Sequence, residues 1–274
     1  MNDGLQFGDY PVGCRSYSLT MKAIPVLSLF VLMSPLVAQN APTPAAKKPE
    51  QAKQEMLPNQ QAFLNLPEES RKEFAKHIND ANRLFQQKRI FETLDELEKA
   101  SKIFADSPEY FELRGSCYVE IRAFDKALTD YRRALQLSKD DVGIKFNIGE
   151  VYFVTKQWQK SCDILEEVVK QLQKDRQDLS RLAEFKIMLC KKKLGKNTEV
   201  KALAEKFDFL DDSPYYYYAQ AALAYDDKDL TKAEEWLARA NRIFNDANTL
   251  APWQDTMVEY GYIKSFYGDN TDAE

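Results

Sequence analysis

The chain is poor in the residues from which enzymes usually build reactive sites. Its 274 residues include one histidine, His77, and four cysteines. A nucleophile–histidine pair would have to use His77, and helical spacing places no Asp or Ser beside it to complete a triad. No Cys-x-x-Cys pair occurs, so the ligand spacing of a zinc site is missing as well. We therefore expect no catalytic residue, no cofactor and no metal site.

Glycine and basic runs are also scarce. The chain has nine glycines, 30% charged residues and no alternating segment flanked by Asn-Gly or Asp-Gly turns. This composition argues against a strand-and-turn fold and favours a helical one. The net charge is −5, so the chain gains nothing from counterion release on nucleic acid, and we expect no nucleic-acid partner.

Long apolar runs are missing except near the N-terminus. Residues 23–38 carry no charge, follow Lys22, and end at Ala38 before a polar stretch. About 14 apolar residues suit the core of a signal peptide, whereas a bilayer span needs about 20. We predict a signal peptide over residues 21–38, and hence an exported protein of the periplasm or cell envelope. An uncleaved membrane anchor is the alternative.

The segments beside this run are interpreted from composition. Residues 1–20 precede Met21 and are predicted to be an extension that arises from the choice of an upstream start codon. Residues 39–60 are rich in Ala, Pro, Lys and Gln and are predicted to be a disordered linker. A helical domain is expected over residues 61–267, followed by a polar tail at 268–274.

Three cysteines remain after the predicted signal peptide: Cys117, Cys162 and Cys190. Their number is odd and all three lie in helical patterns, whereas exported domains held by disulfides usually carry more cysteines, in pairs. We interpret them as small core residues. A bridge between two of them and a reactive thiol remain as alternatives.

What the chain does contain is an internal repeat. Gly115 and Gly149 lie 34 residues apart (149 − 115), and the same order of large and small side chains surrounds each. Six of the seven aligned pairs keep their size class. The aligned pairs are Phe111 and Lys145, Gly115 and Gly149, Tyr118 and Tyr152, Phe124 and Trp158, Ala127 and Ser161, Tyr131 and Leu165, and Ala134 and Val168.

This pattern resembles the tetratricopeptide repeat (TPR) family, in which each repeat is a pair of antiparallel helices and successive copies stack. The resemblance implies an all-α fold, a right-handed α-α superhelix of about five helix pairs plus a C-terminal capping helix. Lys186 occupies an aromatic column of the fourth repeat, which makes that repeat degenerate. The expected repeats lie near residues 74–107, 108–141, 142–175, 176–213 and 214–247, with the capping helix at 249–267.

Two further features support this helical interpretation. Ser107-Pro108 and Ser213-Pro214 begin equivalent blocks, and Ser followed by Pro is typical of a helix start. Small residues such as Gly115 and Ala127 are expected where two helices approach closely, and a larger side chain there costs about 1 to 3 kcal/mol.

In the family, certain positions of each first helix face the concave side of the superhelix, and here they form a mostly apolar groove. The resemblance implies a non-catalytic scaffold that binds a partner peptide or helix in this groove. Packing of some of these aromatics against the C-terminal helix, folded into the groove, is the alternative. The predicted groove residues are Ile78, Asn82, Phe85, Val119, Phe146, Asn147, Phe153, Arg181, Ile187, Tyr215, Tyr218 and Tyr225.

Some members of the family bind a terminal carboxylate through a clamp of Lys, Asn and Arg side chains. Only Asn147 and Arg181 match that clamp here, and Glu112 would repel a carboxylate, so we do not expect this class of partner. Nothing in the sequence specifies another partner or an oligomeric state.

Two other functions are weighed beside the scaffold. Tyr215 to Tyr218 form an aromatic cluster, together with Trp253, that would suit a glycan or a small ligand. In the cluster we predict a core position for Tyr217 and groove positions for Tyr215 and Tyr218. A cysteine-dependent enzyme is the less favoured third possibility.

Overall fold

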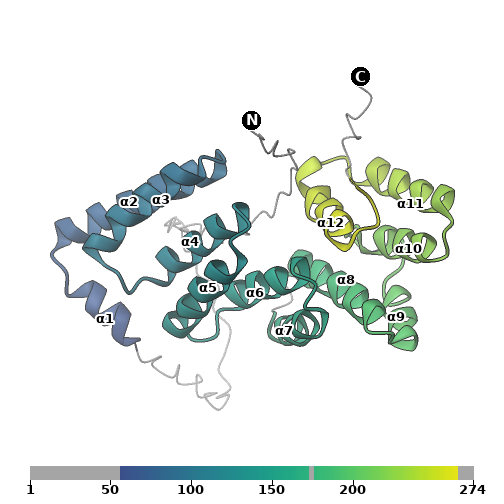
Figure 1. Cartoon of the computed structure of the whole chain (residues 1–274), viewed down its shortest axis with the longest axis horizontal. Helices are drawn as coiled ribbons and strands as arrows, with labels where there is room; N and C mark the ends of the chain where they lie inside the picture. Colours follow the sequence, from purple (N-terminus) through teal and green to yellow (C-terminus); the bar gives the residue numbers. More distant parts are fainter. Residues whose placement is uncertain (1–55, 173–175, 265–274) are drawn as a thin grey trace, which may run out of the picture.

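The computed structural model describes residues 56–172 and 176–264. The predicted N-terminal extension, the signal peptide, most of the linker and the polar tail lie outside these ranges. Within them the chain forms twelve helices and no strand (Figure 1). The helices are α1 (Pro58–Leu64), α2 (Glu68–Gln86), α3 (Ile90–Ile103), α4 (Pro108–Glu120), α5 (Phe124–Ser138), α6 (Val142–Val154), α7 (Trp158–Gln171), α8 (Gln177–Lys193), α9 (Asn197–Ala204), α10 (Tyr215–Asp226), α11 (Leu230–Ile243) and α12 (Ala247–Tyr260).

Ten of these helices form five consecutive pairs, from α2 with α3 to α10 with α11, and the pairs stack along a curved path (Figure 1). The outer helices α5, α7 and α11 bury a narrow stripe, whereas the inner helices α6, α8 and α10 bury most of their length. The prediction of an all-α solenoid of about five helix pairs is therefore confirmed. We call the side of the stack lined by α2, α4, α6, α8 and α10 the inner face.

One of the two predicted Ser-Pro helix starts has the expected capping, whereas α10 begins at Tyr215 with Pro214 as its N-cap residue. The side chain of Ser107 accepts a hydrogen bond from the backbone N–H of Tyr110, with Pro108 as the first residue of α4. Asp141 caps α6 in the same way, and Asp246 caps α12. These acceptors satisfy backbone donors that have no partner within the helix, which fixes where each helix begins.

The two glycines of the repeat lie where paired helices touch. A Cβ atom on Gly115 would be 2.8 Å from Cε1 of Tyr131, and one on Gly149 would be 2.7 Å from Cδ2 of Leu165. Both distances are shorter than carbon atoms tolerate, and the neighbouring side chains are buried. The 34-residue period of glycine thus reflects close contact of α4 with α5 and of α6 with α7.

The irregular fourth pair has a simple structural cause. Its inner helix α8 has 17 residues, whereas α4 and α6 have 13 each. The four additional residues make about one extra helical turn. The outer helix of that pair, α9, is short, with eight residues. This difference in helix length explains why the repeat that runs from residue 176 to residue 214 departs from the regular 34-residue spacing.

The helical domain begins slightly earlier than predicted. Helix α1 begins at Pro58, inside the segment 39–60 that was expected to be linker. Its Phe63 ring packs against the rings of Phe74 and Phe104, with centroids 5.3 Å away in both cases. The linker prediction is therefore wrong for residues 58–60, because Phe63 gives this short helix an apolar contact.

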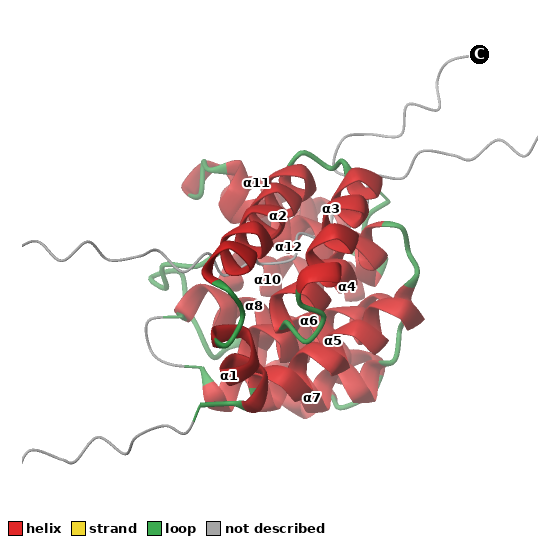
Figure 2. Ribbon diagram, turned by 90° about the vertical axis from the view of Figure 1, so that its left-hand side faces the viewer, coloured by secondary structure: helices red, strands yellow, loops and turns green. Residues whose placement is uncertain are grey.

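The last helix does not extend the stack as a terminal cap. Helix α12 contacts α6 and α8, which precede it by several helices in the sequence. Figure 1 shows α12 on the concave side of the stack, and in Figure 2, viewed along the stack, it lies near the middle of the molecule. The expected cap over residues 249–267 is corrected to an inward-folded helix that ends at Tyr260, followed by a glycine turn.

Candidate functional site: the inner face

The half of the inner face nearest the C-terminus is filled by α12. The Trp253 indole lies among the rings of Phe185, Tyr215 and Tyr218, with centroid distances of 5.4, 6.3 and 5.6 Å. All four of these side chains are buried. This aromatic cluster joins α8, α10 and α12 into one core.

A second aromatic group extends this core toward α6. Tyr260 stacks on Phe153 with centroids 6.3 Å apart and also packs against Trp158. Just beyond α12, Tyr262 stacks on Tyr225, and its hydroxyl donates a hydrogen bond to Asp226. Both ends of α12 are therefore held by rings from the inner helices.

A buried group of three charged residues fixes the helix between these clusters. Nζ of Lys186 on α8 lies 2.8 Å from Glu150 on α6 and 3.0 Å from Glu259 on α12. The same Nζ is 4.4 Å from the centroid of the Phe153 ring. Burial raises the pKa of Glu150 above its ordinary value, and Lys186 opposes that rise. The ion pairs give α12 a defined position along the inner face.

These contacts overturn part of the predicted groove. Phe146, Phe153, Ile187, Tyr215 and Tyr218 are buried and do not line an open surface. The alternative that the C-terminal helix occupies the groove holds for this half, because Trp253, Met257 and Tyr260 supply the apolar partners. Of the predicted groove residues at this end, Arg181 and Tyr225 are half-buried, and Tyr225 stacks on Tyr262.

The same contacts exclude the tyrosine cluster as an exposed aromatic platform for a glycan. Tyr217 occupies the core as predicted, but Tyr215 and Tyr218 are buried as well. Tyr216 is half-buried against Trp236 and Phe209. The four tyrosines cover nearly every direction around α10, and neighbouring helices enclose three of them.

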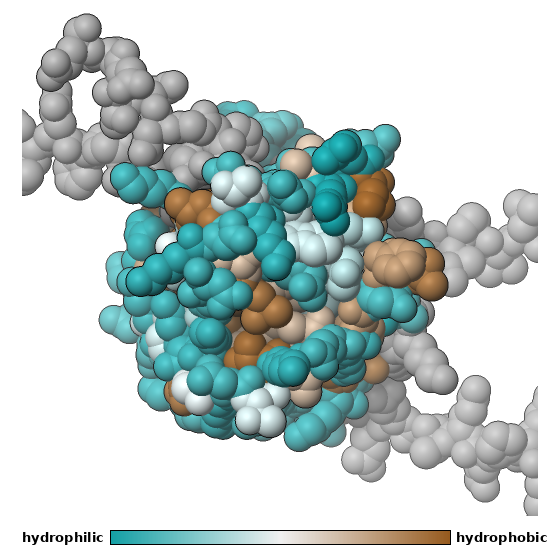
Figure 3. All heavy atoms as spheres, turned by 90° about the vertical axis from the view of Figure 1, so that its right-hand side faces the viewer, coloured by the Kyte–Doolittle hydropathy of each residue, from teal (hydrophilic) through white to brown (hydrophobic). Residues whose placement is uncertain are grey.

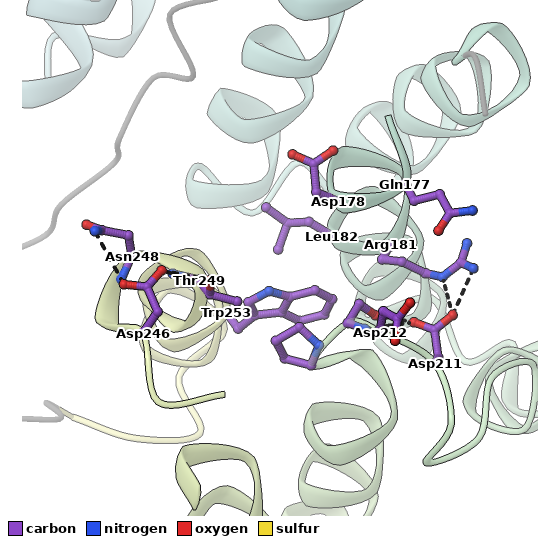
Figure 4. A pocket seen from close by; sticks show the side chains of 12 residues that line it. Gln177, Asp178, Arg181, Leu182, Asp211, Asp212, Asp246, Asn248, Thr249 and Trp253 are labelled. Atoms are coloured by element: carbon purple, nitrogen blue, oxygen red, sulfur yellow. Dashed lines mark hydrogen bonds and ion pairs between the residues drawn. The ribbon is translucent and has the colours of Figure 1, made fainter. Parts of the chain in front are cut away.

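A cleft lies beside the N-terminal end of α12 (Figure 4). Its volume is about 380 Å³, and Trp253, Leu182 and Pro214 form its apolar wall. Predicted groove residue Arg181 lies at its edge but is already engaged, because its guanidinium donates to Asp211 at 2.9 Å and lies over the Phe207 ring. The remaining carboxylates lie near the starts of α8, α10 and α12, where acidic side chains stabilise helix ends.

The outer surface at this end of the molecule is mostly hydrophilic, with scattered apolar spots (Figure 3). Its exposed large apolar side chains come from separate elements, the α9–α10 loop and the two ends of α11. They are Phe209, Leu210, Leu230 and Ile243. Because single exposed apolar residues are common on soluble proteins, they do not define a second site.

The other half of the inner face, formed by α2 and α4, is not covered by the aromatic contacts of α12. Ile78 and Asn82 on α2 and Val119 on α4 are half-buried, while Phe85 is buried. Asn147 of α6 is nearly buried and donates a hydrogen bond from Nδ2 to Oε1 of Glu112 at 3.3 Å. The predicted groove thus divides into a filled half and a half with solvent access.

Glu112 also belongs to this half of the inner face, and the sequence did not reveal its unusual environment. Burial raises its pKa to about 7, and the negative charges of Asp141 and Glu109 act in the same direction, against the hydrogen bond from Asn147. The sequence indicated only that Glu112 would repel a terminal carboxylate, because its partial burial depends on how α4 and α6 pack. A carboxyl with this pKa is partly ionised near neutral pH.

The cysteines do not form a reactive centre. Cys117, Cys162 and Cys190 are buried free thiols, so the prediction that they are small core residues is consistent with their surroundings. Burial raises their thiol pKa values to about 12, 11 and 12. Nucleophilic cysteines require the thiolate near neutral pH. In residues 56–172 and 176–264 there is also no group of His, Cys, Asp or Glu arranged to hold a metal ion.

Across the same two ranges, no helix is both long and apolar enough to cross a membrane.

No protein-family model and no curated protein matches the sequence. Among the solved structures with a similar fold is pilF of Pseudomonas aeruginosa, with TM-score 0.51 and 16% identity over 70% of this chain and 97% of that chain. Another is TTC0263, a thermophilic TPR protein of Thermus thermophilus, with TM-score 0.50 and 16% identity over 68% of this chain and 99% of that chain. The helix pairs, their glycine contacts and these likenesses together give the protein the fold of a tetratricopeptide repeat solenoid.

Proposed function

We propose that this protein is a non-catalytic interaction scaffold of the cell envelope, and that it binds a partner peptide or helix on the α2–α4 half of its inner face. The observation that carries this proposal is the division of the inner face. Helix α12 fills one half with buried aromatic and charged contacts, while Ile78, Asn82 and Val119 keep solvent access in the other.

The chemistry of this half suits a segment that contributes apolar side chains. Ile78 and Val119 offer aliphatic contact, and Asn82 offers an amide beside them. Successive inner helices present such side chains in a row, which allows one extended or helical segment to contact several repeats. A short contact of this kind typically has micromolar affinity, about −8 kcal/mol.

Two observations support the non-catalytic and envelope parts of the proposal. The three described cysteines are buried with raised pKa values, and the apolar segment 23–38 has the length and flanks of an export signal. N-terminal sequencing of protein isolated from cells tests export. A mature chain beginning at Gln39 is expected, and one that retains residues 21–38 would argue against a cleaved signal.

Site-specific photo-crosslinking in cells tests the binding surface. We expect a photoreactive phenylalanine at Asn82 on the inner face to capture a defined partner, and the same group at exposed Phe91 on α3 to capture none. Adding Val119→Asp should lower the yield at position 82 about tenfold, because a charge replaces an apolar contact. Equal capture at both positions, or a yield unchanged by Val119→Asp, would contradict this assignment.

A further inference from the structure

Three carboxylates with low exposure on the inner helices α4, α6 and α8 each pair with a lysine. Glu120 pairs with Lys88 at 2.7 Å, Glu150 with Lys186 at 2.8 Å, and Glu184 with Lys206 at 2.8 Å. These carboxylates have low exposure, and each has a cation from a neighbouring element. Such pairing offsets much of the cost of removing a charge from water.

Glu112 departs from this pattern. It lies on the same inner helix as Glu120, yet among the described residues it forms no ion pair, and its one side-chain donor is the neutral amide of Asn147. The hydroxyl of Ser116, one turn later, donates to the backbone oxygen of Glu112 and contacts Tyr131. The charges that act on Glu112 are those of Asp141 and Glu109, both negative.

The position of Glu112 links this unpaired carboxylate to the binding surface. Val119 lies seven residues further along α4, on the same face of the helix. Ile78 holds the corresponding place, 34 residues earlier (112 − 78), on the neighbouring inner helix α2, which contacts α4. A segment that lies across Ile78 and Val119 therefore passes Glu112.

We propose that Glu112 determines which partners this face accepts, by pairing with a lysine or arginine of a bound segment whose apolar side chains contact Ile78 and Val119. This inference rests on the proposed function. An incoming cation supplies the counter-charge that the neighbouring carboxylates have within the chain. Lysine and arginine also suit the surface because their methylene stems pack on aliphatic side chains while the charged end reaches the carboxylate.

A peptide selection with matched variants tests this inference. Full-length chain is used to select from a phage-displayed library of random peptides about 12 residues long. We expect each enriched sequence to contain Lys or Arg. Its synthetic peptide should bind Glu112→Gln at least about tenfold more weakly than wild type near pH 8, because a charge pair with low exposure is lost. Glu73→Gln, which changes an exposed carboxylate on the neighbouring inner helix α2, is the control and should change affinity less than about twofold.

The outcomes separate the inference from the function on which it rests. Peptides that lose affinity on Val119→Asp but bind Glu112→Gln as well as wild type would overturn the role of Glu112 and leave the binding surface standing. If no enriched peptide loses affinity on Val119→Asp, both the binding surface and the role of Glu112 are overturned. The last measurement tests binding of a synthetic peptide of residues 39–55, which contains Lys47, Lys48 and Lys53. Glu112-dependent binding of that peptide would make the chain's own linker the occupant and overturn the proposal of a separate partner.

Discussion

At the scale of single residues, two charged side chains show how context decides their role. Lys186 occupies a column in which the repeat elsewhere has aromatic residues, and it is almost fully buried. It is held there by Glu150 and Glu259 and by the face of the Phe153 ring. Glu112 is half-buried and has no such partners. The charge of Lys186 is compensated inside the fold, and the charge of Glu112 is not.

This difference predicts how stability depends on pH. The pKa of Glu112 is about 7 in the folded chain and has its ordinary value of 4.5 when unfolded. Between these values the folded state holds a proton that the unfolded state has lost, so stability falls as pH rises from 4.5 to 7 and then levels off. Glu112→Gln removes this ionisation. It should raise the free energy of unfolding near pH 8 by about 1 to 3 kcal/mol and leave it nearly unchanged near pH 4.

Urea denaturation of both proteins at several pH values measures this effect. Glu73→Gln on α2 serves as the control, because that exposed carboxylate should alter stability by less than about 0.5 kcal/mol. A stability difference between Glu112→Gln and wild type that does not grow across this pH range would show that Glu112 ionises as an ordinary carboxyl. Together with the peptide selection, a variant that gains stability while losing affinity would separate a binding role from a structural one.

At the scale of elements, the solenoid depends on the close approach of paired helices. The hydrogen atom of Gly115 faces the ring of Tyr131, and Gly149 faces Leu165 in the same way. Gly115→Ala should therefore destabilise the chain by about 1 to 3 kcal/mol, although alanine favours helix, because the ring of Tyr131 is buried and cannot move freely. Thermal unfolding followed by circular dichroism measures the loss.

A double variant distinguishes this contact from a general effect of substitution. Tyr131→Leu shortens the opposing side chain, and it also removes the hydrogen bond between Tyr131 and Ser116. We expect Gly115→Ala to cost less in the Tyr131→Leu background than in wild type, by about 1 kcal/mol. Strict additivity of the two substitutions would show that the contact does not control the packing of α4 on α5.

At the scale of the whole molecule, α12 turns part of an open stack into a closed core. Stacked repeats normally contact their immediate neighbours only, but here Lys186 and Glu259 meet across 73 residues of sequence. Trp253 is the centre of this arrangement. Trp253→Ala should destabilise the chain by about 3 to 5 kcal/mol through loss of a large buried side chain.

Hydrogen exchange locates the effect of that substitution. Amide protection should fall in α6, α8 and α10, which surround α12, and change little in α2 and α3. Trp236→Ala on the outer helix α11 is the matched control, because Trp236 is half-buried and lies outside the α12 contacts. Equal losses of protection from the two substitutions would mean that α12 does not unite this half of the molecule.

The sequence alone determined the class of fold, because the pattern that specifies a helix pair is local. The spacing of Gly115 and Gly149, the Ser107 cap and the columns of large side chains all act within one repeat or between adjacent ones. These features predicted the helix pairs and the irregular fourth unit, and they named Ile78, Asn82 and Val119 as groove residues. The sequence also predicted a helix over residues 249–267, after the last repeat.

Only the tertiary structure decided where that helix packs. An apolar stripe specifies that a helix is buried on one side, but it does not specify the partner, so α12 suited a terminal cap and the inner face equally well. The choice depends on the complementary rings of Phe185 and Tyr218 and on the buried charge of Lys186, all distant in sequence. The same long-range packing closes one half of the predicted groove. Packing of α4 on α6 leaves Glu112 without an intramolecular counter-charge. The spacing of residues in the sequence cannot show this, because the counter-charges of the other carboxylates come from separate elements.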